Sequence, residues 1–301
     1  MIKSVTVTNY IGESKTFILA DPYKSGFLID NITGLGPPNA DINTTDMASI
    51  DGSIFNSSRL GNRNIVMTLR LLFNPQVEDT RHASYKYLPI KKKVTLTIET
   101  DNRTCETYGY VEMNEPDIFS KEESTMISII CPDPYFHSIE PTITTFYGIE
   151  PKFEFIWSNE SLTEDLIEFG EILRRTEQTV WYSGDAEVGV KIIIHAIGPV
   201  KNISVYNVKS REVMRIYTDK IQQQTGAGIN AGDDIIINTI RGQKSVQLLR
   251  NGLYTNIINC INRDADWFLL RKGDNLFTYI AEDGLKNLTF RIENQVLYEG
   301  V

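Results

Sequence analysis

Histidines and cysteines carry much of the chemistry of protein sites, and this chain of 301 residues has only three of each. The histidines lie far apart in the sequence: His82, His137 and His195. The cysteines do as well: Cys105, Cys131 and Cys260. Neither set has the His-x-x-x-His or Cys-x-x-Cys spacing that places two ligands on one metal ion. We therefore expect no metal, no cofactor, and cysteines that are buried free thiols.

A glycine-rich segment matches a phosphate-binding pattern but has the wrong neighbours. Residues 226–231 read Gly-Ala-Gly-Ile-Asn-Ala, as in the Gly-x-Gly-x-x-Ala loop that binds dinucleotides. Such a loop follows a strand and opens a helix, whereas polar residues 222–224 precede this one and strand-like residues 234–238 follow it. The segment is predicted to be a flexible hairpin loop.

Carboxylates that could act as a general acid and base occur here as adjacent pairs, Asp233 with Asp234 and Glu122 with Glu123. Neighbouring residues of a strand point to opposite faces, so both pairs are predicted to be solvated charges. The sequence has no Gly-x-Ser-x-Gly elbow and no His-Glu-x-x-His motif. We predict no catalytic residues and expect that the chain is not an enzyme.

The tryptophans are the remaining candidates for a binding site. All of them lie in the second half of the chain: Trp157, Trp181 and Trp267. An exposed indole could stack on a sugar ring, whereas large aromatic side chains also supply much of the buried area of a small β core. Both alternatives stay open, and Trp181 and Trp267 are the candidate glycan platform.

Composition and charge limit the class of protein. The many aromatic residues, 14 Tyr and 13 Phe, favour a mainly β fold. The formal charge of −9 argues against specific DNA binding, which depends on basic side chains that displace counterions. The N-terminal residues lack the apolar segment of a signal peptide, and no apolar run is long enough to span a bilayer. We expect no membrane insertion and no secretion by a signal peptide.

The first half of the chain is predicted to consist of strands and one helix. The clearest strand covers residues 63–73, and another covers residues 93–100 and turns at residues 101–103 into a hairpin. Between them a helix is expected, with Asn74 as its N-cap and Pro75 at its first position. Polar residues 41–54, with Asp51-Gly52 as a turn signal, predict an exposed hairpin.

A strand followed by two prolines separates the halves. Residues 125–130 alternate as a strand does, and Pro132 and Pro134 then prevent its continuation. This break predicts one domain over residues 1–140 and another over residues 141–301.

The second half reads as an all-β domain. Short strands are expected at residues 143–146 and 152–157, and a short helix after Ser161, whose spacing to Glu164 fits a capping box. From residue 179 onward, short apolar runs alternate with glycine-containing turns, a pattern typical of a β-sandwich or barrel.

Several segments, taken in order, resemble the distal tail protein of siphophages that infect Gram-positive bacteria. In the first half they are DGSIFNSSRLGNRNIVMTLRLLFNP from Asp51, YKYLPIKKKVTLTIETDNR from Tyr85, GYVEMNEPDIFSKEE from Gly109 and CPDPYF from Cys131. In the second half they are GDAEVGVKIIIHAIGPVKN from Gly184, GQKSVQLLRNGLYTNIINCI from Gly242 and the terminal LYEGV. The order of these segments carries the resemblance, which covers nearly the whole chain.

The resemblance implies a structural part of a phage virion tail that is assembled in the host cytoplasm. It implies an N-terminal split β-barrel with one helix and a long hairpin, whose six copies form a hub ring between the tail tube and the baseplate or tail tip. It further implies a C-terminal β-sandwich of the galectin or jelly-roll kind. The implied partners are a homohexamer, the tail tube protein, a tail-tip or tail-associated protein, and either a receptor-binding protein or a host glycan, while DNA passes through the ring without specific binding.

Three functions are weighed from these observations. In the first, a tail hub, the candidate ring contacts lie in two segments: Phe55, Arg59, Arg63, Asn102 and Arg103. In the second, a glycan-binding module that aids host adhesion, Trp181 or Trp267 holds the sugar. The third, a β-sandwich hydrolase, would need two carboxylates facing each other across a cleft, about 5 to 9.5 Å apart.

Overall fold

The structure is a computed structural model that describes residues 1–48, 51–73, 75–151 and 170–301. The chain divides into two compact units, residues 1–140 with 297–301 (unit 1) and residues 141–296 (unit 2). The sequence assigns residues 297–301 to the second domain, but strand β25 (Leu297–Tyr298) pairs with β10 (Phe136–Ser138) of unit 1. The strand predicted at residues 152–157 and the helix predicted after Ser161 lie outside the described residues.

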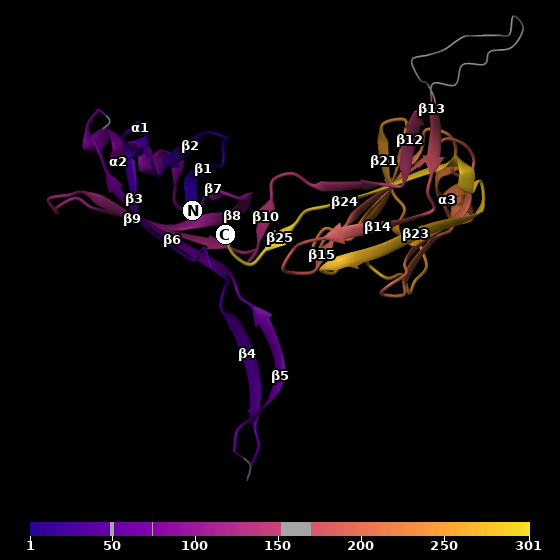
Figure 1. Cartoon of the computed structure of the whole chain (residues 1–301), viewed down its shortest axis with the longest axis horizontal. Coiled ribbons are helices and arrows are strands. Elements are labelled where there is room, and N and C mark those ends of the chain that lie inside the picture. Colours follow the sequence, from indigo (N-terminus) through magenta and orange to yellow (C-terminus); the bar gives the residue numbers. More distant parts are fainter. Residues whose placement is uncertain (49–50, 74, 152–169) are drawn as a thin grey trace, which may run out of the picture. The chain divides into compact units, whose positions relative to one another are not determined.

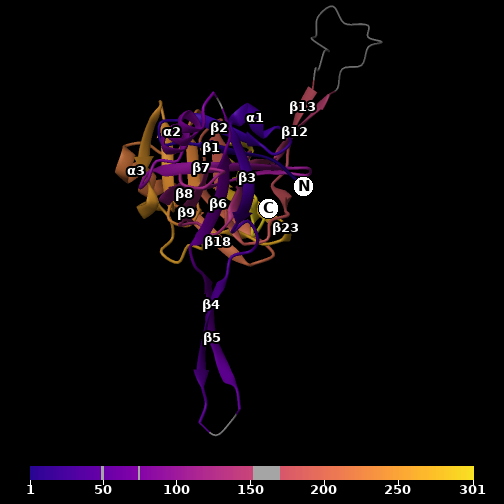
Figure 2. The same ribbon diagram turned by 90° about the vertical axis from the view of Figure 1, so that its left-hand side faces the viewer.

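Unit 1 is built on one mixed-length antiparallel sheet, which Figure 2 shows face on. Its main path runs β2-β1-β7-β8-β9-β6-β3, and β10 and β25 pair beside β8. The strand bounds are β1 Ile2–Thr8, β2 Ser14–Ile18, β3 Phe27–Thr33, β6 Arg63–Leu71, β7 Lys93–Thr100, β8 Thr104–Asp117 and β9 Ser124–Cys131.

The two edge strands of this path come together without pairing. The one-turn helix α1 (Pro22–Ser25) joins β2 to β3, and the rings of Phe17 and Phe27 meet edge to face with centroids 5.1 Å apart. The sheet is therefore curved round its core but has no closed barrel, as expected of a split barrel.

Alternation along the strands fills the core of unit 1. In β6 every second residue from Arg63 to Leu71 is buried, while the residues between them are exposed or half-buried. Strand β9 lies between β8 and β6 in the middle of the sheet and buries Ile127 and Ile129. Leucine, isoleucine and valine at such alternating positions are what a pleated surface needs to bury one face. The mainly β class predicted from composition is confirmed.

The helix predicted after β6 is present but begins later than expected. Helix α2 covers Val77–Tyr87, with Gln76 as N-cap in place of Asn74, which lies outside the described residues. Pro75 is therefore not at the first helical position. The reason lies in the strand, since the N–H of Leu72 still bonds to the carbonyl of Gly26, so the chain stays extended past the end of β6. Leu88 ends the helix before Pro89, as predicted.

The polar segment before β6 forms a long hairpin, as predicted. Strands β4 (Ala40–Asp46) and β5 (Ser53–Leu60) pair antiparallel with each other and, among the described strands, with no other (Figure 1). Every side chain of β4 is exposed, and so is every side chain of β5 before Leu60. Gly52 has a φ of +98°, which a glycine adopts without strain at the turn.

Unit 2 is a β-sandwich of a six-stranded and a four-stranded sheet. Their spatial orders are β11-β24-β16-β19-β20-β21 and β14-β23-β17-β18. Shorter pairs are β12-β13 and β15-β22. The bounds are β11 Thr142–Thr145, β12 Tyr147–Pro151, β13 Gly170–Arg174, β14 Glu177–Tyr182, β15 Val188–Gly189, β16 Lys191–Ala196, β17 Lys201–Asn207, β18 Glu212–Ile216, β19 Asp234–Asn238, β20 Ser245–Arg250, β21 Leu253–Asn256, β22 Leu269–Leu270, β23 Gly273–Asp283 and β24 Leu288–Asn294.

Aromatic side chains join the two sheets of the sandwich. Phe290 of β24 stacks on Tyr279 of β23 with ring centroids 4.9 Å apart, and Phe146 contacts both rings edge to face. These residues are buried, and such packing is what holds two sheets face to face.

The glycine-rich segment after residue 225 is not a hairpin loop. Helix α3 (Thr218–Thr225) precedes it, and Gly226, with a φ of +83°, ends this helix in the left-handed conformation. The segment then leads into β19, so it joins a helix to a strand. The polar run 222–224, which argued against a preceding strand, lies in α3. Two single-turn 3-10 helices complete unit 2, Ile258–Cys260 and Leu285–Asn287.

Candidate ring interface

The β4–β5 hairpin exposes apolar side chains that a monomer would be expected to cover. Phe55 is 61% exposed and Ile42 is 63% exposed, and Ile54 and Met47 are exposed as well. Phe55 pairs with Thr44, and Ile42 lies two residues from Thr44 on β4, so Phe55 and Ile42 share one face of the hairpin. An apolar ribbon of this kind is a surface for association.

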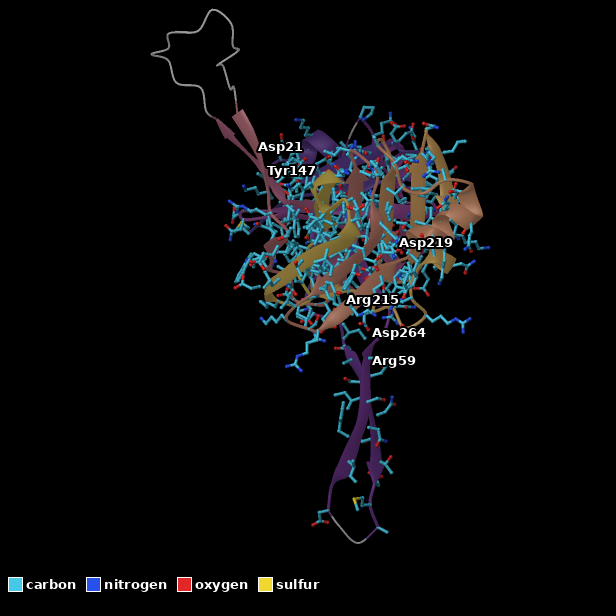
Figure 3. The ribbon with its side chains drawn as sticks, turned by 90° about the vertical axis from the view of Figure 1, so that its right-hand side faces the viewer. Asp21, Arg59, Tyr147, Arg215, Asp219 and Asp264 are labelled. Carbon is cyan, nitrogen blue, oxygen red and sulfur yellow. The ribbon has the colours of Figure 1, made fainter. Side chains whose placement is uncertain are left out.

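The backbone of the hairpin is also open to pairing. Because β4 and β5 pair only with each other among the described strands, the outer edge of each presents unpaired N–H and C=O groups. Figure 3 shows Arg59 near the end of the hairpin that joins the sheet. Its guanidinium Nε lies 3.2 Å from Oδ2 of Asp41, and both side chains are exposed. The hairpin thus offers two edges, an apolar face and an exposed ion pair to a neighbour.

The turn between β7 and β8 is the second predicted contact segment. Asn102 and Arg103 are exposed there, and the Thr100 hydroxyl accepts from the N–H of Arg103 and donates to its carbonyl. The Arg103 guanidinium lies 4.6 Å from the ring centroid of Tyr298, a cation–π contact that attaches the turn to the C-terminal segment. Asn102 and Arg103 both line a pocket of about 400 Å³ within unit 1.

Arg63, the third predicted contact, is instead an internal residue. It is 2% exposed, so its side chain cannot contact another subunit, and we remove it from the candidate ring contacts. Its guanidinium donates to four main-chain carbonyls, those of Gly34 at 2.5 Å, Gly36 at 2.6 Å, Pro134 at 2.8 Å and Glu299 at 2.6 Å.

The environment of Arg63 explains why a charge is tolerated inside unit 1. Its Cζ lies 4.4 Å from the ring centroid of Phe136. Burial lowers the pKa of Arg63, yet an arginine stays protonated, so its donors must all find acceptors. The four carbonyls belong to the segment before the hairpin, the turn after β9 and the C-terminal segment. Arg63 therefore fixes the base of the hairpin to the rest of unit 1.

The two tryptophans predicted as a glycan platform differ in exposure. Trp181 is 65% exposed on β14, because its neighbours Val180 and Tyr182 take the core-facing positions. Trp267 is half-buried in the segment before β22, with Nζ of Lys244 5.2 Å from its ring centroid. Trp157 lies outside the described residues. The exposed indole of Trp181 is thus the better placed of the two for a ligand.

Of the four carboxylates predicted to be solvated, Asp233 is buried, whereas the Glu122 side chain is 64% exposed. Asp233 is 3% exposed and lies 2.6 Å from Nη2 of Arg250. Burial alone would raise the pKa of Asp233, but hydrogen bonds from Arg250 and from the Asn230 N–H lower it overall. Asp234 bonds to Nδ1 of His195, and Glu122 and Glu123 pair with Arg70 and Arg81. The prediction was wrong for Asp233, because its partner Arg250 is distant in sequence.

The cysteines are buried free thiols, as their number and spacing predicted. All three cysteines are free and buried, and burial raises the pKa of the Cys105 and Cys131 thiols to about 11. No group of His, Cys, Asp and Glu that could hold a metal ion occurs within the described residues. No helix among those residues is both long and apolar enough to cross a bilayer.

Comparison with known proteins places the fold among phage tail hub and baseplate proteins. No protein-family model and no curated protein matches the chain in sequence. The similarity to solved structures is nevertheless extensive, since the matches cover both units together.

One such structure is the Dit protein of phage SPP1, described as a paradigm of the hub adsorption apparatus in phages that infect Gram-positive bacteria. The TM-score is 0.65 at 11% sequence identity, over 97% of this chain and 98% of that one. A chain of the phage p2 baseplate in its activated conformation with Sr has a TM-score of 0.50 at 13% identity, over 97% of both chains. The resemblance to distal tail proteins predicted from the sequence is thus confirmed at the level of the fold.

Proposed function

We propose that this chain is the subunit of a phage tail hub, in which six copies form a ring between the tail tube and the baseplate or tail tip. The observation that carries the proposal is the fold match to the SPP1 Dit protein over 97% of this chain. A β-sandwich alone is shared by many unrelated proteins, whereas this combination of split barrel, long hairpin and sandwich is matched as a whole.

The hairpin supports the ring. Apolar side chains and open strand edges are normally protected in a soluble protein, and the described side chains of β4 and β5 have little such protection within one chain. A head-to-tail contact repeated around a closed ring covers one surface of every copy with a different surface of the next. Phe55 and Arg59 on the hairpin, with Asn102 and Arg103 on the second turn, are the proposed contacts.

The charge supports passage of DNA through such a ring. A duplex carries one negative charge per about 1.7 Å, and a chain with a formal charge of −9 repels it. The ring would therefore conduct DNA without holding it. The proposed partners are the tail tube protein on one side and a tail-tip or tail-associated protein on the other, and the proposed location is the virion tail.

Purified particles from the phage or lysogen that encodes this chain test the function directly. Affinity gold attached to a tagged chain should label the junction of tail tube and tail tip, and quantitative mass spectrometry should find six copies per tail. A chain absent from purified tails, or present at the much higher copy number of a tube protein, would refute the proposal.

A glycan-binding role is a second candidate, and one observation favours it. The Trp181 indole is 65% exposed on a β-sandwich, and such a ring can stack on a sugar. Titration of the chain with wall polysaccharide should quench tryptophan fluorescence, and a Trp181→Ala variant should lose that signal. A signal that persists in the variant would exclude Trp181 as the platform.

A further inference from the structure

The outer face of the six-stranded sheet of unit 2 contains a pocket of about 260 Å³. Its lining comes from strands β12, β16, β19 and β24: Tyr147, Ile193, His195, Asp234, Thr289 and Arg291, together with Phe290, whose ring is buried between the sheets. Figure 3 shows Tyr147 at the start of β12. Neither Trp181 nor Trp267 lines this pocket, so it is a different candidate site from the tryptophan platform.

The strand register explains why these side chains meet. On β24, β16 and β19, Thr289 pairs with His195 and His195 pairs with Asp234, which makes one row across the sheet. Two residues along, Arg291 pairs with Ile193 in the next row. Paired strands are about 4.8 Å apart, and residues two apart in a strand face the same side. The pocket is therefore a small polar array built on rigid strands.

Each carboxylate in and beside this pocket is paired with a basic side chain. His195 Nδ1 lies 2.7 Å from Oδ1 of Asp234, and Arg291 Nε lies 3.1 Å from Oε1 of Glu293. Lys191 Nζ lies 3.4 Å from the other oxygen of Glu293. An anionic ligand would have to compete with these two carboxylates, and a cationic ligand with Lys191 and Arg291. A neutral ligand that both donates and accepts hydrogen bonds meets neither obstacle.

Sugar hydroxyls have this double character. The Asp234 carboxylate accepts hydrogen bonds, the Arg291 guanidinium donates them, and the Thr289 hydroxyl does both. With Nδ1 of His195 held by Asp234, Nε2 is the ring nitrogen that can reach a ligand. Tyr147, which is 40% exposed, and Ile193 supply apolar surface for the C–H face of a sugar ring.

We propose that this pocket binds a neutral saccharide unit, with Asp234, Arg291, Thr289 and His195 as hydrogen-bonding groups and Tyr147 as the aromatic wall. This inference rests on the second candidate function, glycan binding, but places the sugar in this pocket and not on Trp181, and it is independent of the ring. If the chain bound no saccharide, its oligomeric state would be unchanged. If the chain formed no ring, each monomer would still contain the pocket.

Saturation-transfer difference NMR on the full chain is the test, with glucose, galactose, rhamnose and N-acetylglucosamine as probes. A single exposed site of this size is expected to bind one of them with a dissociation constant of about 1 mM. Thr289→Val, which keeps the shape of the side chain, and Asp234→Asn should each weaken binding by about fivefold or more, as loss of a hydrogen bond predicts. Tyr254→Ala is the matched control, because it removes an exposed aromatic ring of β21 that does not line the pocket, and it should bind as the unaltered chain does.

Two results would overturn the assignment. One is the absence of transfer to all four sugars at concentrations well above that constant. The other is binding that Trp181→Ala abolishes while Thr289→Val and Asp234→Asn retain it. Thermal unfolding of every variant establishes that it is folded, and because these residues are not buried, Thr289→Val in particular should unfold at the temperature of the unaltered chain.

Discussion

The side chain of Arg63 and the main chain of Glu299 are joined by a hydrogen bond of 2.6 Å, although 236 positions separate them in sequence. The same guanidinium bonds to the carbonyl of Pro134, 71 positions away. Pro134 belongs to the last turn before the chain leaves unit 1, and Glu299 to the segment that returns to it. The buried guanidinium of Arg63 thus joins the segment that leaves unit 1 to the segment that returns to it.

Replacing Arg63 with lysine should destabilise the protein strongly. Lysine has three donors on one atom and cannot reach four carbonyls that surround a planar guanidinium, so at least one buried carbonyl loses its partner. Each such loss costs about 1–3 kcal/mol. Urea denaturation should therefore show a fall of about 2–5 kcal/mol in the free energy of unfolding.

Arg59→Lys is the matched control for that substitution. The Arg59 side chain is 79% exposed, and exposed ion pairs contribute about 0–1 kcal/mol, so this variant should unfold like the unaltered chain. Equal stability of Arg63→Lys and Arg59→Lys would show that the buried network is not what holds unit 1.

Two glycines that accept hydrogen bonds from Arg63 should respond differently to alanine. Gly34 has a φ of +82°, and a Cβ there would lie 2.0 Å from the carbonyl oxygen of Asn64. A Cβ on Gly36 would meet nothing within 4 Å. Gly34→Ala should cost more than about 3 kcal/mol of stability, and Gly36→Ala less than about 1 kcal/mol. The two midpoints of thermal unfolding check this, and a reversed order would contradict the structure around Arg63.

The strands of unit 1 could be predicted from the sequence because their alternation is local. Residues 63–73 and 93–100 alternate so regularly that burial of one face follows from the pleat. The exposed hairpin followed from polar residues and a turn signal. The break after β9 followed from the geometry of Pro132 and Pro134, because proline cannot pair within a central strand.

What could not be predicted depends on residues distant in sequence. No residue close to Arg63 in the sequence indicates that four carbonyls surround its guanidinium, so Arg63 was expected to be exposed like other arginines. Asp233 comes just before β19 and its partner Arg250 ends β20, so the two meet only when these strands pair. The sugar-sized pocket likewise requires the register of β24 with β16. Helix α3 was missed because its short polar turns resemble a loop, and the αL conformation of Gly226 is visible only in the structure.

The buried thiols predict how stability changes in alkaline solution. The pKa values of Cys105 and Cys131 rise from 9.0 to about 11 in the folded chain because burial disfavours the thiolate. The unfolded chain therefore loses these protons at lower pH than the folded chain. The resulting stabilisation is complete below pH 9 and is lost as the pH rises towards about 11.

Urea denaturation across that range should reveal this dependence. The free energy of unfolding should fall by about 1–2 kcal/mol per thiol more in the unaltered chain than in a Cys105→Ala/Cys131→Ala variant. Taking the difference removes the titration of lysines and tyrosines, which both chains share. Parallel curves for the two chains would mean that the thiols do not contribute.

Polar substitutions on the hairpin should weaken assembly without unfolding the monomer. Ile42→Ser and Phe55→Ser alter one exposed face of β4–β5 and remove apolar surface that only a neighbour can cover. The double variant should shift the assembly towards monomers by at least about tenfold in concentration. Ile143→Ser, on an exposed position of unit 2, is the control and should assemble normally. Analytical ultracentrifugation measures both, and equal assembly would remove the hairpin from the interface.

The solution mass of the purified chain tests the central claim most directly. Native mass spectrometry, or light scattering coupled to size-exclusion chromatography, at tens of micromolar should give six times the mass of one chain, because assembly follows mass action. Electron micrographs of the same sample should then show closed rings. A strict monomer at that concentration, with no ring in assembled tails, would contradict the proposal that this chain forms a tail hub.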